Sequence, residues 1–473
     1  MKRAKPSPEK TAVPPHPHDN GWHRLPARER EAVQAYAAEY RTFLSAAKTE
    51  REAYGLALAA ARPAGFRPLE DCRRLTAGDK VWVGGHGRTL LLAVIGRRPL
   101  PDGLRIVGAH TDAPRLDAKP APLYEDGGLG WLDTRYYGGI KKYQWVTLPL
   151  ALHGVIVRQD GSAATVAIGE EPGDPVFTIT DLLPHLGKEQ DKKTLEDGIK
   201  GENLNVLFGS HPAPGGQAKD PVKAALLALL QERYAVSEED LGSADLEIVP
   251  AGPARDLGLD RSMILGYGQD DRVCAFAGLR ALLDLDGVPE HTAVVLLCDK
   301  EEIGSIGATG MDSLFFENAV AELLHRADPR AGDLGLRRAL ARSKMLSADV
   351  AAAHDPNYPD VSAPHENMAR INGGLAVSKY GGGRGKSGAS EASAEFTAEV
   401  RRIFNTGDVL WQTGELGKVD AGGGGTIAKF LARYGMDVVD CGVPLLSMHA
   451  PWEVAGKLDA YMAWKGYRAF LAS

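Results

Sequence analysis

Two short apolar runs, one followed by a histidine and an aspartate and the other by a cluster of acidic residues, constrain the fold of this chain more than any other feature. The runs Leu104–Val107 and Thr292–Leu297 lead into GAHTD at 108–112 and CDKEEIGS at 298–305. Short apolar runs that end in a polar loop are typical of strands buried on both faces of an α/β sheet. The carboxyl ends of such strands line the crevice where these sheets bind ligands. The pattern therefore predicts an α/β fold with a polar site at the strand ends.

The order of segments along the chain predicts that this α/β unit is interrupted. Residues 115–250 are β-rich and contain a hairpin with an Asp-Gly turn, whereas the α/β pattern occupies 26–114 and 251–473. Because His110 precedes the β-rich block and the other candidate site segments follow it, we expect one discontinuous α/β domain with the block inserted. The proline-rich residues 1–25 are expected to form an N-terminal arm.

Composition and charge argue against several classes of protein. The chain has 473 residues and a formal net charge of −7, whereas a nucleic acid or an anionic membrane requires a basic binding surface. No apolar run reaches the roughly 18 residues needed to span a bilayer, and the N-terminus lacks the apolar core of a secretion signal. The four cysteines form no CxxC pair. We therefore expect a cytoplasmic protein with no nucleic acid or membrane partner.

Five segments concentrate residues that can bind metal ions. Together they offer two imidazoles and three carboxylates, namely His110, one of Asp270 or Asp271, Glu302, Asp349 and His449. A mixed nitrogen and oxygen set suits zinc, cobalt or manganese. Two divalent cations would be neutralised by three carboxylates and one hydroxide, so charge balance favours a two-metal site.

Two further carboxylates, those of Glu301 and Asp112, lie close to these candidate ligands in the sequence. Glu301 adjoins Glu302, so one of the two can bind a metal ion while the other faces a water molecule as a general base. Asp112 follows His110 by two residues and can accept the hydrogen of the second ring nitrogen, which fixes the tautomer that a ligand needs. Each segment alone has an ordinary interpretation as a helix cap, a solvated turn or a core histidine. The coincidence of all five favours the metal site.

These segments, in this order, resemble the M18 metallopeptidases, which are the aminopeptidase I and aspartyl aminopeptidase enzymes. The resemblance runs from about residue 30 to the C-terminus. The matching stretches are HTD at 110–112, Asp270–Arg272, DKEEIGS at 299–305, SAD at 347–349 and SMHAPWE at 447–453. The resemblance implies a mixed-sheet α/β/α zinc-peptidase catalytic domain in which the inserted β-rich block is a dimerisation domain.

The resemblance also implies how the metal ions are held. Each of two ions is bound by one histidine and one acidic residue, His110 with Asp349 and His449 with Glu302. Asp271 bridges the two ions. This stretch departs from the family, because Gly-Gln-Asp-Asp-Arg stands at 268–272 where the family often has Gly-Arg-Leu-Asp-Asn. Asp270 therefore remains the alternative bridge.

Three further roles follow from the same resemblance. Glu301 is the general base, acting on a water molecule that bridges the metal ions. Asp112 orients His110. His185, in the middle block, resembles a histidine that reaches the active site of a neighbouring subunit and stabilises the tetrahedral intermediate.

The implied activity is that of a metal-dependent aminopeptidase with two divalent metal ions. Zinc is the expected metal, and cobalt or manganese are the alternatives. It would remove the N-terminal residue from peptides with a free N-terminus. The stretch Lys379–Ser393 is closer to bacterial aminopeptidase I-like members, which implies a neutral or broad preference, and the family assembles as homododecamers built from dimers. Two other readings stay open, an M20-like deacylase or carboxypeptidase and a catalytically dead metal-binding scaffold.

Overall fold

A nine-stranded mixed sheet forms the centre of the larger part of the molecule. The computed structural model describes residues 20–215 and 218–473, so most of the expected arm at 1–25 lies outside the described residues. The strand order is β1 (Arg67–Pro68), β2 (Lys80–Gly85), β3 (Thr89–Val94), β13 (Thr292–Cys298), β4 (Leu104–His110), β14 (Lys344–Ser347), β18 (Asp437–Gly442), β16 (Leu375–Ser378) and β17 (Trp411–Thr413). The four adjacent strands β13, β4, β14 and β18 run parallel.

Helices cover both faces of this sheet, because its central strands are apolar on both sides. Leu90 and Leu92 belong to one buried cluster and Leu91 to another, so successive side chains of β3 enter opposite cores. The first core is covered by α1 (Ala27–Ala46), α2 (Glu50–Ala61), α5 (Gln269–Leu283), α8 (Ala394–Thr406) and α10 (Lys457–Leu471). The second is covered by α6 (Phe315–Ala327), α7 (Gly332–Arg342) and α9 (Ala428–Ala432). The expected α/β/α layering is confirmed.

The chain between Ala27 and Ala61 forms two helices, α1 and α2, rather than one continuous helix. Thr49 ends the interruption because its side chain accepts a hydrogen bond from the backbone of Glu52, while the Glu52 carboxylate accepts one from the backbone of Thr49. This capping box satisfies backbone donors that the first turn of α2 would otherwise leave unpaired.

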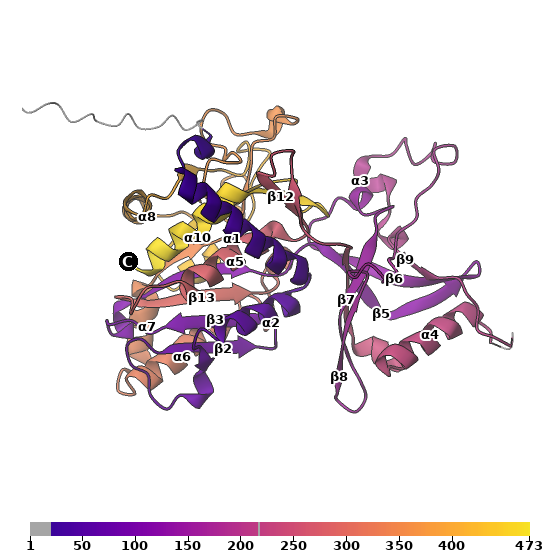
Figure 1. Cartoon of the computed structure of the whole chain (residues 1–473), viewed down its shortest axis with the longest axis horizontal. Coiled ribbons are helices and arrows are strands. Elements are labelled where there is room, and N and C mark those ends of the chain that lie inside the picture. Colours follow the sequence, from indigo (N-terminus) through magenta and orange to yellow (C-terminus); the bar gives the residue numbers. More distant parts are fainter. Residues whose placement is uncertain (1–19, 216–217) are drawn as a thin grey trace, which may run out of the picture.

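A separate six-stranded antiparallel sheet is built entirely from residues between 115 and 250. Its order is β8 (Ala163–Ile168), β7 (Leu150–Val157), β10 (Asp245–Pro250), β5 (Arg115–Asp126), β6 (Leu129–Tyr137) and β9 (Val206–Gly209). It has its own apolar core, and the helices α3 (Leu195–Gly198) and α4 (Pro221–Tyr234) accompany it. Figure 1 shows this sheet beside the unit that contains β2, β3 and β13. The chain enters it directly after β4.

A third, five-stranded sheet brings two distant stretches together. Its order is β11 (Arg255–Leu257), β12 (Met263–Gly266), β20 (Glu453–Gly456), β19 (Pro444–Leu446) and β15 (Ala351–Ala352). Strands β12 and β20 are antiparallel, with Gly266 opposite Glu453. The loop that follows β12 therefore lies beside the loop that precedes β20.

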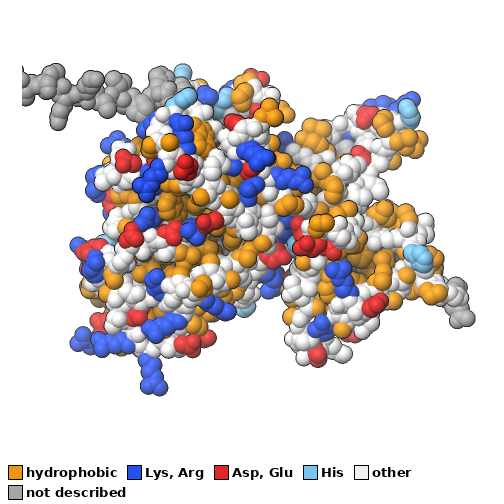
Figure 2. All heavy atoms as spheres, in the orientation of Figure 1, with side chains coloured by type: hydrophobic (Ala, Val, Ile, Leu, Met, Phe, Trp, Pro, Cys, Tyr) orange, Lys and Arg blue, Asp and Glu red, His pale blue; other side chains and the backbone are white. Residues whose placement is uncertain are grey.

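The surface is mixed in charge, and Figure 2 shows acidic and basic side chains interspersed over the visible face. Among the described residues, no helix is both long and apolar enough to cross a membrane.

Candidate metal centre

Three of the five predicted site segments lie at the carboxyl ends of adjacent parallel strands. His110 ends β4 and is paired with Cys298, the last residue of β13, so the turn with Glu301 and Glu302 lies next to it. On the other side of β4, Ser347 of β14 is paired with Gly108, and Asp349 follows two residues later. The register of three strands therefore brings these side chains to one edge of the sheet.

The other two segments reach the same edge from the five-stranded sheet. Asp270 lies at the start of α5, four residues after the end of β12, and His449 lies in the loop between β19 and β20. Because β12 and β20 are neighbours, both side chains face the cluster formed by the strand ends. The two sheets together complete the site.

The Asp270 carboxylate lies between the two imidazoles. Its Oδ1 atom is 3.2 Å from Nε2 of His110, and its Oδ2 atom is 3.3 Å from Nε2 of His449. Nε2 of His110 is also 3.9 Å from Oδ1 of Asp349, and Nε2 of His449 is 3.5 Å from Oε2 of Glu302. Each imidazole thus faces Asp270 and one further carboxylate.

This arrangement differs from the expectation at the bridging position. The Asp271 side chain is fully buried and turns away, so that its Oδ2 accepts a hydrogen bond of 3.3 Å from the backbone N–H of His110. Asp270 and Asp271 both have non-helical backbone angles, although they lie at the start of α5. The two adjacent carboxylates consequently point in different directions, and the geometry favours Asp270 over Asp271 as the bridge.

The donor set fits cations. Two groups of side chains have ligand atoms within 4.8 Å of one another, one with His110, Asp270 and Glu302 and the other with His110, Glu301 and Asp349. The buried atoms Oδ1 of Asp270 and Oε1 of Glu302 accept no hydrogen bond from any described group. A buried carboxylate oxygen without a donor is costly unless a cation faces it, and nitrogen and oxygen donors suit zinc and similar ions.

The electrostatics of the cluster agree with this interpretation. Burial raises the pKa of Glu301 to about 7, with the negative charges of Asp270 and Asp112 adding to the effect and His110 opposing it. Burial likewise raises the pKa values of Glu302 and Asp349. Burial would raise the pKa of Asp270 too, but the two imidazoles beside it lower it. Closely spaced buried carboxylates repel one another when all are ionised, which raises their pKa values. Cations beside them would offset this repulsion.

Asp112 connects His110 to the turn that carries both glutamates. Its carboxylate accepts hydrogen bonds from the backbone N–H groups of Glu301 and Glu302, at 3.1 and 3.2 Å. Its Oδ1 atom is 3.3 Å from Nδ1 of His110, and the hydroxyl of Tyr137 donates to its Oδ2 at 2.9 Å. Asp112 therefore contacts both His110 and the glutamate turn, and its orienting role remains a prediction.

Three residues that contact the cluster have no role predicted from the sequence. The Glu453 carboxylate accepts hydrogen bonds from the backbone N–H groups of His449 and Asp270, at 2.8 and 3.1 Å. Tyr137 contacts Asp112, and the carbonyl oxygen of Gly139 lies 3.0 Å from Nδ1 of His449. The position of Glu453 inside the SMHAPWE stretch was a usable signal. No motif near Tyr137 or Gly139 in the sequence predicts that these residues contact Asp112 and His449.

His185 lies away from these contacts in the single chain. It is exposed in the stretch before α3, and it makes no hydrogen bond or ion pair to any residue that the structure describes. Its expected role in a neighbouring subunit remains a prediction.

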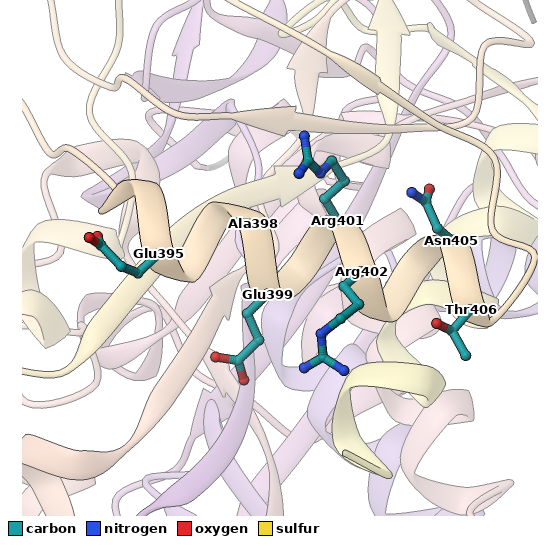
Figure 3. Close-up of a pocket in the computed structure, with 7 residues that line it drawn as sticks. All are labelled: Glu395, Ala398, Glu399, Arg401, Arg402, Asn405 and Thr406. Carbon is teal, nitrogen blue, oxygen red and sulfur yellow. The ribbon is translucent and has the colours of Figure 1, made fainter. Parts of the chain in front are cut away.

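A hollow along α8 offers no comparable chemistry. Figure 3 shows its lining side chains, which include Glu399 and Arg402, projecting from this one helix. Glu399 pairs with Arg105, near the start of β4, so the hollow lies at the amino end of the strand that carries His110 at its carboxyl end. Five residues of extended strand separate the two ends by about 16 Å.

Comparison with known proteins identifies the family. The family described as "Aminopeptidase I zinc metalloprotease (M18)" matches residues 43–471. The chain belongs to the M18 family. The resemblance carried by the HTD, DKEEIGS and SMHAPWE stretches is thereby confirmed, and this M18 peptidase is a metallopeptidase, a hydrolase of the aminopeptidase family.

The similarity to relatives extends over nearly the whole M18 chain. A "Probable M18 family aminopeptidase 1" of Clostridium acetobutylicum is 51% identical over 458 residues, covering 96% of this chain and 98% of the relative. A "Probable M18 family aminopeptidase 2" of Stutzerimonas stutzeri is 29% identical over 436 residues, covering 91% and 96%. The greater similarity to the first agrees with the expected likeness to bacterial aminopeptidase I-like members.

Solved structures agree with the fold of this M18 peptidase. An M18-family aminopeptidase from Thermotoga maritima has a TM-score of 0.92 at 43% identity, covering 96% of this chain and 98% of that one. Aminopeptidase I from Clostridium acetobutylicum has a TM-score of 0.90 at 49% identity, covering 98% and 100%. The expected fold class is therefore confirmed.

Proposed function

We propose that this M18 peptidase removes the N-terminal residue from peptides at a site for two divalent cations. The observation that carries the proposal is the Asp270 carboxylate between two imidazoles that each face one more carboxylate. His110 and Asp349 would hold one cation, His449 and Glu302 would hold the other, and Asp270 would be shared. Zinc is the first choice because of the family, with cobalt or manganese as alternatives.

When bound, two such cations lower the pKa of water and polarise a carbonyl group. Glu301 lies where it can act as the general base and then as the general acid of the reaction. It is partly buried beside the cluster, and its pKa of about 7 suits a group that takes and returns a proton near neutrality. Glu301 takes a proton from the attacking water and passes it to the leaving amine. Asp112, through the backbone of Glu301, holds this carboxylate in position.

The substrate carries a free N-terminus and a neutral or variable first residue. The resemblance of the Lys379–Ser393 stretch to bacterial aminopeptidase I-like members favours this preference over a strict requirement for an acidic residue. The four cysteines are buried and unpaired, which supports a reducing location such as the cytoplasm.

We also place this chain in a homododecamer built from dimers through the inserted sheet, with His185 serving a neighbour's site by stabilising the developing oxyanion. Three apolar side chains around His185 support a contact there, since Leu182, Leu183 and Leu186 are 54, 51 and 69% exposed in the single chain. A solved relative described as the mApe1 dodecamer has the same fold, with a TM-score of 0.73.

The function is tested with aminoacyl p-nitroanilides and their N-acetylated counterparts, on protein loaded with zinc, cobalt or manganese. We expect turnover of the free amines only, and we expect Glu301→Gln to lose at least about a hundredfold in kcat while keeping its metal content. Glu302→Gln is the matched control, because it should lose metal as well as activity.

Three results would contradict the proposal. Cleavage of the acetylated substrates would indicate a deacylase, and absence of turnover with every metal would indicate a scaffold. Full activity of metal-loaded Glu301→Gln would exclude Glu301 as the base.

A further inference from the structure

The end of β6 touches the candidate metal centre although it belongs to the inserted sheet. Tyr137 is the last residue of β6, and Gly138 and Gly139 follow it. Two contacts connect this short stretch with the site, one on the side of each imidazole.

The first contact acts on His110 through Asp112. The Tyr137 hydroxyl donates to Oδ2 of Asp112 at 2.9 Å, and the guanidinium of Arg115 lies 3.9 Å from the centre of the tyrosine ring. Nδ1 of His110 lies 3.0 Å from the carbonyl oxygen of Asp112. A carbonyl only accepts, so Nδ1 carries a hydrogen, and in the neutral form of the ring that binds a cation Nε2 presents its lone pair toward Asp270.

The second contact acts on His449 directly. Its Nδ1 atom is 3.0 Å from the carbonyl oxygen of Gly139. This contact selects the same tautomer of the neutral, cation-binding ring, because the hydrogen must again be on Nδ1 and the lone pair on Nε2. The turn after β6 of the inserted sheet therefore fixes the orientation of the His449 ring, which faces Asp270 on the side opposite His110.

The turn itself is fitted closely against the site. A Cβ atom on Gly138 would lie 3.3 Å from Cβ of Glu302 and 3.4 Å from the backbone of Pro114, and one on Gly139 would lie 3.3 Å from Nδ1 of His449. Gly138 also has a φ of +74°, a conformation that favours glycine. Side chains at these positions would press on the candidate ligands.

We infer that Tyr137 and the Gly138–Gly139 turn are positioning residues of the metal centre, which the inserted sheet supplies to the catalytic unit. The inference rests on the proposed two-cation function. Hydrogen bonds to the second nitrogen of a ligating histidine orient the ring and raise its basicity, and losing them commonly costs 10- to 100-fold in metal affinity or activity. The inserted sheet therefore acts on the cations through both histidines.

The test compares Tyr137→Phe with Tyr136→Phe. Tyr136 precedes it on β6 but is 50% exposed, so its variant controls for the loss of a hydroxyl. The measurements are zinc affinity, by competition with a chromogenic chelator, and the midpoint of thermal unfolding of the metal-free protein. We expect Tyr137→Phe to bind zinc about tenfold more weakly, with a metal-free midpoint like that of Tyr136→Phe.

A second pair of variants tests the turn. Gly128 has the same φ of +74° as Gly138 but nothing within 4 Å of an added Cβ atom. We expect Gly138→Ala to weaken zinc binding about tenfold or more and Gly128→Ala to leave it unchanged, because only the first presses on Glu302.

The outcomes separate this inference from the proposed function. Equal zinc affinities in wild type, Tyr137→Phe and Gly138→Ala would overturn the positioning role while leaving the metal centre intact. A Tyr137→Phe defect seen only in thermal stability would also overturn it, since that result indicates a structural contact. Absence of zinc binding by the wild type would overturn the proposed function and the inference with it.

Discussion

Asp270 and Asp271 are neighbours in the chain, yet the fold gives them opposite surroundings. Asp270 faces two imidazoles, and these lower its pKa against the effect of burial. Burial raises the pKa of Asp271 well above its ordinary value, and its carboxyl group accepts a hydrogen bond from a backbone amide. One of the pair is therefore suited to a cation, and the other is suited to a neutral structural role.

Replacing each aspartate by asparagine distinguishes these roles. We expect Asp270→Asn to lose most bound metal and at least about a hundredfold in activity, since it removes the shared negative charge. Asp271→Asn should keep its metal and cost only about 1 kcal/mol of stability, because an amide can still accept the bond from His110. Metal analysis and unfolding in urea measure both effects. The reverse pattern would restore Asp271 as the bridge.

Metal binding should depend on pH through the same cluster. In the metal-free protein, burial opposes protonation of His449, but the adjacent carboxylates of Asp270 and Glu302 raise its pKa to about 10, and the pKa of Glu301 is about 7. Cations displace these protons, so zinc affinity should rise as the pH increases from about 6 to 8.

Calorimetry in buffers of different ionisation enthalpy will show the released protons directly. His185→Ala is the control, because its cluster is unchanged and it should release the same number. An affinity that does not vary with pH would contradict the assigned protonation states.

The sequence predicted most of the candidate site, and its failures have a local cause. Histidine and acidic residues at strand ends are visible as motifs, which is how His110, Glu302 and His449 were found. The choice between Asp270 and Asp271 depends on two backbone conformations at the start of α5, and the residue types do not specify them. Gly139 meets His449 across 310 residues through a backbone carbonyl, a contact without any side-chain signature.

At the level of elements, a buried ion network joins α2 to the inserted sheet. Glu50, in the first turn of α2, is fully buried and pairs with Arg88 at 3.0 Å and with Arg115 of β5 at 3.2 Å. Arg115 also pairs with Glu247 of β10 at 3.1 Å. The hairpin of β7 and β8 was predictable from its Asp-Gly turn, whereas this network depends on how the inserted sheet packs against α2.

Removing Arg115 should destabilise the protein strongly. Arg115→Met leaves Glu50 and Glu247 buried without their shared cation, and breaking such a pair costs about 3–5 kcal/mol. Arg337→Met is the control, because its partner Asp333 is exposed and surface pairs contribute at most about 1 kcal/mol. Urea unfolding of both metal-free variants measures the difference. Similar free energies of unfolding would show that the network contributes little.

On the scale of the whole molecule, the proposed assembly places parts of each site on different chains. Glu301 would act in one subunit and His185 in its neighbour. Each single variant, Glu301→Gln or His185→Ala, should then be nearly inactive while forming particles of twelve 50.5 kDa chains.

Mixing the two inactive variants tests this division. After dissociation and reassembly together, some sites combine an intact Glu301 with an intact His185 of the neighbour, so activity should reappear. Light scattering confirms the assembly, and His185→Ala reassembled alone is the control. Mixed particles of the expected mass that remain inactive would exclude His185 from a neighbouring site.

The insertion of a whole sheet directly after His110 also has a consequence for the synthesis of the protein. More than three hundred residues separate His110 from His449, so at 5–20 residues per second the ribosome completes the site roughly 15–70 s after it makes the first histidine. During that interval the ligands Asp270, Glu302 and Asp349 and the general base Glu301 are added in turn, and His449 is the last of these residues to be made. A growing chain therefore cannot hydrolyse the peptides around it, and the cell receives the peptidase only when its C-terminal helix has been made.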